Sequence, residues 1–423
     1  MNVLLLGGGG REHAMAWRLS ESPLRRQLFV APGNAGTSDY ATNIALDPND
    51  FPAVKEVVMA NTIRLVICGP EEPLVRGIKD FFKSDPDLKD VRFVGPDAAA
   101  AQLEGSKAYA KEFMAEFDIP TAGYKRFTAR TLDAGLEYLE QCKTPIVLKA
   151  DGLAAGKGVV ILNDCGEAKD ELKAMLDGKF GEAGSEVVVE DFLDGIEFSV
   201  FVVTDGENYR ILPVAKDYKR IGVGDTGPNT GGMGSVSHPP FVNADMMAKV
   251  EQRIIKPTLE GIRKRKLDYK GFVFIGLISV ENEPYVIEYN CRMGDPETQS
   301  VMARLSSDFM QLCLDTADGE LGRSVVEIEE RQAATIVLVS GGYPGPYEKG
   351  KIILGIDDVK DSMVFHAGTK RNAAGDIVTN GGRVLAVTSY GETFGEALAL
   401  SYENARKIHF AGSNYRGDIG FDL

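Results

Sequence analysis

The chain has 423 residues, 44% apolar and 26% charged, which is the composition of a folded protein and the length of about three domains. Lysine and arginine number 47 against 62 aspartates and glutamates, and the net charge of −15 argues against nucleic acid or an anionic membrane as a partner. Five scattered cysteines without a Cys-x-x-Cys pair, and no apolar run near the ~20 residues of a membrane helix, predict a cytoplasmic protein without disulfides or zinc.

The first hundred residues alternate strand and helix signals. Short apolar runs predict strands at residues 3–6, 28–31, 65–68 and 91–94. With a helix at 12–19, this alternation is typical of a parallel α/β sheet, and we assign it to a domain over residues 1–104. Glycine-rich loops follow three of the strands, at residues 7–10, 32–37 and 69–73. Because the carboxyl ends of parallel strands meet at one edge, these loops are expected to face one site.

The middle of the chain, residues 105–328, mixes helices with antiparallel strands. Helices are predicted at 105–117 and 248–265. Strands are predicted at 146–150, 158–162, 186–190, 198–203, 272–280 and 285–289. The first four are expected to form antiparallel hairpins around a glycine-rich turn, and residues 121–192 are expected to form a smaller subdomain. The polar segment 216–240, rich in glycine and proline, is predicted to be a long functional loop.

The last part of the chain, residues 329–423, is predicted to be rich in β-structure. Strands are expected at 333–339, 363–367 and 383–388, and a helix at 393–408. The predicted fold class is therefore a multidomain α/β and α+β protein. It has a parallel α/β domain first, a mixed domain in the middle and a β-rich domain at the end.

Residues 7–10 form a glycine-rich loop between a strand and a helix. A dinucleotide-binding fingerprint requires a further glycine where Glu12 stands, so that pattern fails. The loop can still present backbone N–H groups to an anion at the helix N-terminus. The alternative is a tight turn that binds nothing.

A second glycine-rich segment, residues 149–158, carries Lys149 and Lys157 between two strands. It is not a P-loop, because too few residues separate its glycines and Gly158 stands where Ser or Thr would hold magnesium. Glycines let the backbone approach phosphates and lysines supply point charges, so such a hairpin can close over a nucleotide. The alternative is an ordinary flexible hairpin.

Polar side chains single out two further segments. Glu288 and Asn290 alternate along one strand and so share a face, with Arg292 on the same side, which suits Mg²⁺ bridging phosphates. The strand end at residues 190–197 offers backbone groups that can read an adenine edge, and Glu197 can accept hydrogen bonds from ribose hydroxyls. The alternatives are a half-exposed polar strand edge and solvated acidic side chains.

Six motifs occur in the order in which a known family has them. They are Gly-Gly-Arg-Glu-His-Ala at 9–14, Ala-Pro-Gly-Asn-Ala-Gly-Thr at 31–37, Gly-Pro-Glu-Glu-Pro-Leu at 69–74, Lys-Ala-Asp-Gly-Leu-Ala-Ala-Gly-Lys-Gly at 149–158, Thr-Gly-Pro-Asn-Thr-Gly-Gly-Met-Gly at 226–234 and Glu-Tyr-Asn-Cys-Arg-Met-Gly-Asp-Pro-Glu-Thr at 288–298. Together with residues 378–385, they make the chain resemble the glycinamide ribonucleotide synthetases, or phosphoribosylamine–glycine ligases, of the ATP-grasp superfamily. The resemblance runs over nearly the whole chain.

The resemblance implies an N-terminal pre-ATP-grasp domain, a central ATP-grasp fold and a β-rich C-terminal domain. It also implies a reaction of purine biosynthesis, in which ATP drives the joining of glycine to 5-phosphoribosylamine through a glycyl phosphate. Mg²⁺ or Mn²⁺ is then the expected cofactor and ATP a co-substrate. The partners are expected to be small molecules only, and the protein is expected to be a monomer.

The resemblance also assigns roles to individual residues. For ATP binding it implies Lys107, Lys149, Gly152, Gly156, Lys157, Gly158, Glu190, Leu193 and Glu197. Glu288 and Asn290 are the expected metal ligands, and Arg292, Lys219 and Asp217 the expected catalytic residues. For substrate binding it implies Gly10, Arg11, Asn34, Gly36, Thr37 and Glu72, with Asp295 and Glu297 on the glycine side.

The sequence departs from the family pattern in one segment. Lys216 and Tyr218 stand where the family commonly has Gln and His, and Val223 where it has Asp. The roles of individual residues at 216–224 therefore stay open. So does the number of metal ions, because Gly276 and its neighbours offer no acidic ligand one strand before Glu288.

Two other functions remain as alternatives. The first is another ATP-grasp ligase or a carboxylase. The second is a nucleotide-binding regulatory module without turnover. Such a module would be expected to have lost Glu288 or Arg292, and both are present.

Overall fold

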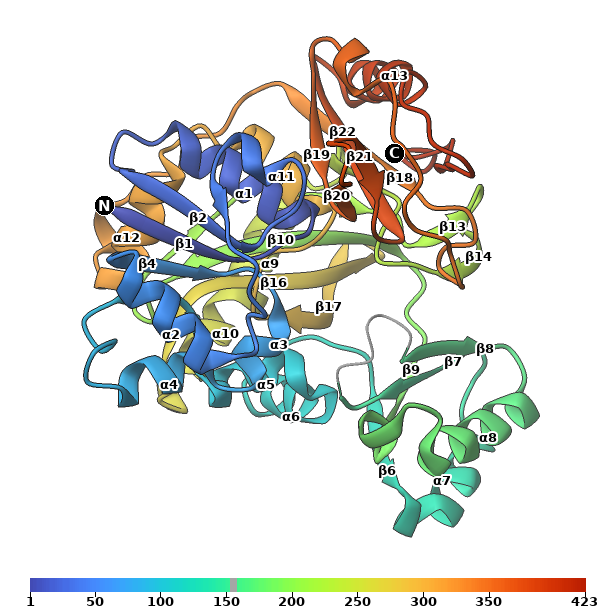
Figure 1. Ribbon diagram of the computed structural model, residues 1–423. Coiled ribbons are helices and arrows are strands. Elements are labelled where there is room, and N and C mark those ends of the chain that lie inside the picture. The colour runs from blue at the N-terminus through green and yellow to red at the C-terminus, as the bar shows by residue number, and fades with distance from the viewer. Residues whose placement is uncertain (153–157) are drawn as a thin grey trace.

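The computed structural model describes residues 1–152 and 158–423, and its first part is a parallel α/β sheet (Figure 1). The parallel strands are β1 (Asn2–Gly7), β2 (Gln27–Pro32), β3 (Thr42–Asn43), β4 (Ile63–Cys68) and β5 (Arg92–Pro96). The helices among them are α1 (Gly10–Glu21), α2 (Phe51–Ala60), α3 (Glu71–Val75) and α4 (Ile78–Ser84). Along β1, Val3 and Leu5 enter one hydrophobic core while Leu4 and Leu6 enter another. Burial of both sheet faces explains the unbroken apolar run.

This sheet continues into the middle of the chain. Strand β5 pairs antiparallel with β16 (Tyr269–Val280), which pairs in turn with β10 (Ile196–Thr204) and β17 (Glu283–Asn290). With β11 (Tyr209–Ile211) the described residues form one sheet of nine strands. Gly95 and Gly271 meet at the junction, where a Cβ on Gly271 would lie 3.0 Å from the Cα of Gly95. The expectation that residues 198–203 belong with the earlier hairpins is therefore wrong, because β10 pairs with strands distant in sequence.

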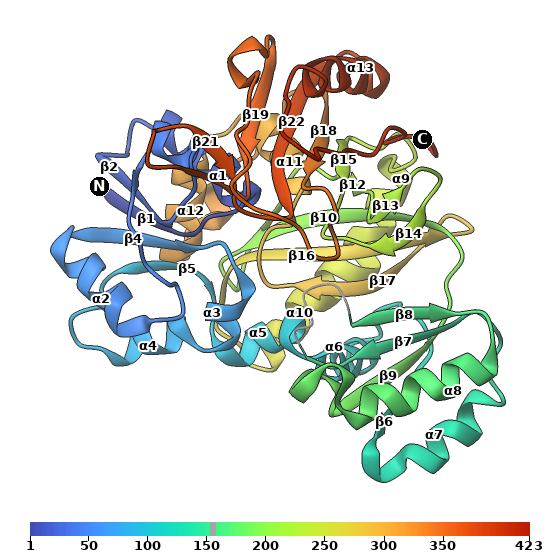
Figure 2. The ribbon, with the colours of Figure 1, turned by 45° about the vertical axis from the view of Figure 1, so that its right-hand side comes forward.

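The predicted subdomain has a four-stranded antiparallel sheet of its own. Its strands, in spatial order, are β6 (Tyr124–Thr128), β9 (Glu186–Asp191), β7 (Ile146–Ala150) and β8 (Val159–Leu162). Helices α7 (Leu132–Leu139) and α8 (Cys165–Ala174) cover one face, and the sheet lies opposite β17 (Figure 2). Helix α6 (Lys107–Glu116) begins two residues later than predicted, because Gly105 ends α5 (Ala98–Gly105) and the Ser106 side chain caps α6.

The segment 216–240 is not the long loop that its glycines and prolines predict. It contains four short strands: β12 (Lys216–Asp217), β13 (Arg220–Gly222), β14 (Thr226–Asn229) and β15 (Gly234–Ser237). Strands β12 and β15 join β18 (Gln332–Val339), β22 (Arg383–Gly391) and β19 (Ser362–His366) in a five-stranded sheet. The last part of the chain is β-rich as predicted, and two of its sheet's strands come from the middle of the sequence.

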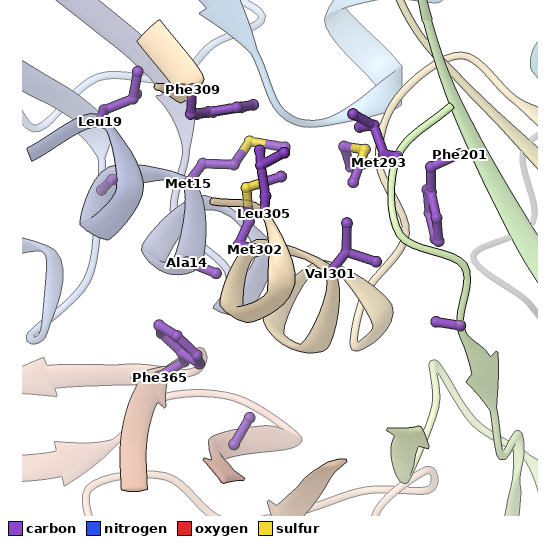
Figure 3. Packing of buried hydrophobic residues seen from close by; sticks show 14 of the residues in the cluster. Ala14, Met15, Leu19, Phe201, Met293, Val301, Met302, Leu305, Phe309 and Phe365 are labelled. Atoms are coloured by element: carbon purple, nitrogen blue, oxygen red, sulfur yellow. The ribbon is translucent and has the colours of Figure 1, made fainter. Parts of the chain in front are cut away.

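The remaining elements include one helix, α11 (Glu297–Arg304), that connects the parts of the molecule. They are α9 (Ala244–Val250), a π-helical turn (Glu251–Ile255), α10 (Lys256–Lys264), α11 (Glu297–Arg304), α12 (Phe309–Asp318), β20 (Thr369–Arg371), β21 (Ile377–Thr379) and α13 (Phe394–Ala405). Helix α11 places Val301 and Met302 in the core that also contains Met15 of α1 and Phe365 of β19, and Met302 lies beside Met15 (Figure 3). The core therefore fixes the first residue of α11, Glu297. No helix of the described residues is long and apolar enough to cross a membrane.

Candidate active site

A cavity of about 810 Å³ lies between the four-stranded sheet and β17. A smaller one of about 170 Å³ shares Lys149, Glu190, Glu288 and Arg292 with it. Most of the predicted site residues line the larger cavity: Arg11, Lys149, Glu190, Leu193, Glu197, Asp217, Lys219, Glu288, Asn290, Arg292, Asp295 and Glu297. Lys107 and Gly158 line the smaller one. The volume suits a small organic ligand.

One end of the cavity holds a buried carboxylate between two lysines. Glu190 Oε2 lies 3.0 Å from Lys149 Nζ and 3.0 Å from Lys111 Nζ, and Lys149 also donates to the Ile287 carbonyl at 3.2 Å. Glu190 Oε1 is buried and accepts no hydrogen bond from the residues that the structure describes. An unpaired acceptor at a cavity wall is suited to receive an amino group of a ligand.

Lys111 is a site residue that the sequence analysis missed. Its side chain is buried, and its Nζ donates to Thr121 Oγ1 at 2.8 Å and to the Ala122 carbonyl at 3.3 Å. Burial lowers the pKa of Lys111 to about 8. Lys111 follows Lys107 by four residues, so the two share a face of α6. The four-residue spacing from Lys107 is the feature of the sequence that could have identified Lys111.

Apolar side chains form the two walls beside Glu190. Val147 and Ile161 come from β7 and β8, while Ile278 and Val286 come from β16 and β17. Two apolar walls with polar groups at one end form a slot that fits a flat heterocyclic ring.

The carboxylate of Glu288 and the amide of Asn290 enter the cavity from β17, as strand alternation predicts. Asn290 Nδ2 donates to the Tyr289 carbonyl at 2.7 Å. Within residues 1–152 and 158–423, no group of three or more His, Cys, Asp or Glu side chains could by itself hold a metal ion. Two oxygen donors at a phosphate site nevertheless fit Mg²⁺, which usually keeps water and substrate phosphates as its other ligands.

A group of one lysine and three carboxylates lies across the cavity. Lys219 Nζ is 2.5 Å from Glu197 Oε2 and 3.1 Å from Asp217 Oδ1. Burial disfavours the charge of Lys219, but Asp217 and Glu197 outweigh it and hold the lysine pKa well above its usual range. Glu297 is buried at the start of α11, and burial, with the nearby Asp217 carboxylate, raises its pKa to about 7.

Arg292 is held by carboxylates on its inner side. Its Nη2 lies 2.8 Å from Glu104 Oε1, and its Nε lies 3.4 Å from Glu71 Oε2. The predicted residue Glu72 is not in either cavity: it is exposed and lies 3.8 Å from Arg76. Glu71 takes its place because successive residues of a helix point about 100° apart, so only one of the pair can face the site.

The comparisons with known proteins identify the family. The family models described as phosphoribosylglycinamide synthetase N domain, ATP-grasp (A) domain and C domain match residues 1–104, 105–298 and 333–422. The chain belongs to the phosphoribosylglycinamide synthetase family. The family resemblance and the ATP-grasp fold expected from the sequence motifs are thereby confirmed.

Individual relatives match over the full length. A phosphoribosylamine–glycine ligase of Yersinia pestis is 46% identical over 427 residues, which cover 100% of this chain and 98% of that protein. The crystal structure of phosphoribosylamine–glycine ligase from Thermotoga maritima has 35% identity and a TM-score of 0.86, covering 98% of this chain and 99% of that one. A biotin carboxylase domain of Hydrogenobacter thermophilus, crystallised with MgADP, shares the fold at 16% identity and a TM-score of 0.71, covering 98% and 91%.

Two of the N-domain residues predicted to bind substrate, Asn34 and Thr37, have side chains that are bonded to other groups of the protein. Asn34 Oδ1 accepts from the backbone N–H of Gly36 at 2.9 Å and of Thr37 at 3.0 Å. Thr37, fully buried, donates its hydroxyl to Asn43 Oδ1 at 2.7 Å. The structure therefore gives Asn34 and Thr37 a role in shaping the loop, and neither lines the cavities.

Three predicted glycines are backbone positions without room for a side chain. A Cβ on Gly10 would lie 2.5 Å from Gln299 Nε2, and one on Gly36 would lie 2.3 Å from the His13 ring. Gly152 donates its N–H to the Ala183 carbonyl at 3.3 Å. The two other predicted residues of that segment, Gly156 and Lys157, lie outside the described residues.

The C domain reaches the cavity through Arg383, another residue that received no role from the sequence. Arg383 Nη2 lies 3.0 Å from Asp295 Oδ2, and its Nη1 donates to the Asp295 carbonyl at 2.5 Å. Gln299 of α11 holds the other carboxylate oxygen of Asp295 at 2.8 Å. Asp295 is thus fixed from two sides, and Arg383 lines the same cavity.

Proposed function

We propose that this chain joins glycine to 5-phosphoribosylamine to give glycinamide ribonucleotide, ADP and phosphate, a step of purine biosynthesis. The observation that carries the proposal is one continuous cavity. Lys149 and Glu190 form its nucleotide wall, and Glu288, Asn290 and Arg292 form the wall that faces them. Full-length similarity to phosphoribosylamine–glycine ligases supports the choice of substrates.

The chemistry requires activation of glycine, because a carboxylate has no leaving group that an amine can displace. A carboxylate oxygen of glycine attacks the γ-phosphorus of ATP, the bond to the β-phosphate oxygen breaks, and ADP leaves. The amine of phosphoribosylamine then attacks the carbonyl carbon, phosphate leaves, and the nitrogen loses one proton. Such phosphoryl transfer depends mainly on positioning and on the neutralisation of charge.

The residues of the cavity suit this reaction. Glu190 Oε1 accepts from the amino group of adenine, while Lys149 fixes that carboxylate and Lys107 faces the phosphates. Arg292, held by Glu104, neutralises charge between carboxylate and phosphate. A divalent ion, Mg²⁺ or Mn²⁺, bound at Glu288 and Asn290 supplies further positive charge at the phosphates.

The four-stranded subdomain serves as a cover for the nucleotide. An acyl phosphate hydrolyses if water reaches it before the amine does. Closure of this subdomain over the cavity would keep water away from the intermediate. The acidic net charge of the chain supports small-molecule partners in the cytoplasm. We propose that the protein works there as a monomer.

An assay of ADP release tests the function. We expect ADP to form only when ATP, Mg²⁺, glycine and phosphoribosylamine are all present. ADP release that needs bicarbonate or another acid instead of glycine would favour a different ATP-grasp ligase or carboxylase. Nucleotide binding without turnover under all these conditions would favour a regulatory module.

Oxygen labelling tests the intermediate. When glycine carries heavy oxygen in its carboxylate, one labelled oxygen should appear in inorganic phosphate per turnover, because that oxygen forms the bond to phosphorus. Arg292→Ala should slow this transfer far more than it weakens ATP binding. Phosphate without label would rule out glycyl phosphate and require an adenylate or an enzyme-bound intermediate.

A further inference from the structure

The segment 416–422 of the C domain contacts residues 216–225, the segment that contains Asp217 and Lys219. We call residues 416–422 the C-terminal strap, and both ribbon views place this end of the chain beside β13 and β14 (Figures 1 and 2). The side chain of Arg416 is fully buried, and its Nη1 donates to the Arg220 carbonyl at 3.2 Å. Asp418 accepts from Arg416 Nε at 2.6 Å and from the backbone N–H of Gly224 at 2.7 Å. The strap is thus bonded to the turn that follows Lys219.

Asp422 meets the same segment nearer to the catalytic side chains. Its Oδ2 lies 3.1 Å from Lys216 Nζ, and its Oδ1 accepts the Tyr218 hydroxyl at 2.8 Å. The side chains of Lys216 and Tyr218 are both buried. One carboxylate therefore uses both of its oxygens to hold two residues that lie two apart in the sequence.

The two anchored residues alternate along the chain with Asp217 and Lys219, and all four line the cavity together with Asp422. Asp217 and Lys219 form their ion pair, and Lys219 contacts Glu197. Lys216 and Tyr218, the alternate residues, make the two bonds to Asp422. The positions of Asp217 and Lys219 are therefore coupled to the bonds that Lys216 and Tyr218 make with Asp422.

The backbone of this segment is bonded on both sides of β12, at Ala215 to Ser199 and at Lys219 to Thr230. Strand β12 has two residues and is the edge strand of the five-stranded sheet, paired only with β15. Beyond it, the Tyr218 N–H donates to the Gly234 carbonyl at 3.1 Å, and the Tyr218 carbonyl accepts from Met233 at 2.7 Å. These backbone bonds fix the course of the chain, and the two bonds to Asp422 fix the side chains of Lys216 and Tyr218 in addition.

We propose that Asp422 is a positioning residue for catalysis, which holds Asp217 and Lys219 at the cavity through Lys216 and Tyr218. The proposal rests on the proposed function for its kinetic consequence, since it deepens the role of the same site. It also bears on two of the three positions at which this sequence departs from the family pattern. Lys216 and Tyr218, two of the three departing residues, are the partners of Asp422.

The test compares Asp422→Asn with Asp358→Asn, an exposed aspartate of the C domain, in the full-length protein. In Asp422→Asn we expect kcat for ADP release to fall by about tenfold and the KM for ATP to stay within about twofold of wild type. The reason is that displacement of Asp217 and Lys219 slows turnover more than it weakens ATP binding. Amide exchange at residues 217–221 should accelerate by about tenfold. Asp358→Asn should match the wild type in all three measurements.

A double-mutant cycle separates positioning from general destabilisation. In a Lys216→Met/Tyr218→Phe background, Asp422→Asn should change kcat and the amide exchange of residues 217–221 by less than about twofold, because both donors to Asp422 are gone. Equal losses in both backgrounds, or unchanged kcat in a folded Asp422→Asn protein, would overturn the proposal.

Two further measurements keep the proposal testable. If Asp422→Asn does not fold, Tyr218→Phe removes only the hydroxyl bond, and a kcat within error of wild type then overturns the proposal. If the wild type shows no ligase turnover, the proposed function fails. Amide hydrogen exchange at residues 217–221 still decides whether Asp422 holds the segment. Faster exchange in Asp422→Asn supports the proposed role of Asp422, and unchanged exchange overturns it.

Discussion

Lys219 and the carboxylates near it form one electrostatic unit. Lys219 lies within 3.1 Å of Asp217 and 2.5 Å of Glu197. Glu297 lies in the same wall of the cavity, and Ser199 donates to it at 3.2 Å. Asp217 and Glu297 are both buried, so the negative charge at this place is reduced when one of the two carboxyl groups keeps its proton. Glu297 is the group whose pKa rises, to about 7.

Glu297→Gln should therefore change how stability depends on pH. A carboxyl whose pKa is raised to about 7 in the folded protein, from an ordinary 4.5, binds its proton more tightly when folded. The stability that this bound proton contributes is fully present below the unfolded pKa of 4.5 and is lost as pH rises through the folded pKa of about 7. The free energy of unfolding should therefore fall between these two pH values. Glu297→Gln should flatten this fall, as measured by urea unfolding at about pH 5 and about pH 8. The exposed Glu137→Gln is the control, and identical pH profiles for all three proteins would contradict the assignment.

Glu288→Gln tests the metal site with a change of one charge and almost no change of shape. Loss of a hard anionic donor from a phosphate site should lower turnover by about a hundredfold or more, with the fold intact. The measurement is ADP release across a range of Mg²⁺ concentrations, with circular dichroism to check folding. Glu281→Gln, at the exposed turn of the same hairpin, should behave as wild type. Wild-type turnover at ordinary Mg²⁺ in Glu288→Gln would remove Glu288 from the site.

The sequence predicts individual site residues when local geometry decides their direction. Glu288 and Asn290 share a face because they alternate on a strand, and that could be read without a structure. Glu104 could not be found in the same way, because its role comes from contact with Arg292, a residue far away in the sequence. Tertiary packing alone decides such pairs.

At the scale of elements, the loop after β2 shows how polar side chains can act without touching a ligand. Asn34 bonds both to its own loop and, through Nδ2, to the His366 carbonyl of the C domain at 2.7 Å. His366 in turn donates its backbone N–H to His13 Nδ1 at 2.6 Å. The loop is thus fixed between two domains, and its shape depends on buried hydrogen bonds.

Thr37→Val tests this interpretation. Valine has the shape of threonine but leaves Asn43 and the Asn34 N–H without their partner, which should cost about 1–3 kcal/mol of stability. We expect a higher KM for phosphoribosylamine and a nearly unchanged KM for ATP, because the loop belongs to the N domain. Kinetics with each substrate varied in turn, together with urea unfolding, measures both effects. A raised KM for ATP alone would place the loop at the nucleotide site instead.

Helices and strands could be predicted from the sequence where apolar residues recur along them in a regular pattern. Strands β1, β4 and β16 were found because their residues are buried, whereas β12 to β15 were predicted to be a loop. Those short strands are rich in glycine and polar residues, and β15 pairs with β18 about a hundred residues later. No window of local sequence contains such a pairing.

At the scale of the whole molecule, the hydrophobic cores do not follow the three family domains. One core combines residues of the N domain, the middle of the chain and the C domain, such as Met15, Met302 and Phe365 (Figure 3). The four-stranded subdomain has a separate, smaller core around Phe127 and Leu148. The molecule is therefore expected to have one large cooperative unit and one smaller unit that can move or open independently.

Hydrogen exchange should reveal these two units and their coupling through ATP. Without ligand, amides of β7 and β9 should exchange through openings of lower free energy than amides of β1 and β4, because the smaller core buries less apolar surface. The cavity takes residues from both units, Lys149 and Glu190 on one side and Glu288 and Asn290 on the other. A nucleotide bound across them stabilises only the closed arrangement, so saturating ATP with Mg²⁺ should raise the protection of β7 and β9. Glycine alone should leave β9 unchanged. If β7 and β1 already exchange equally without ligand, the subdomain is not a separate unit and cannot act as a cover that the nucleotide closes.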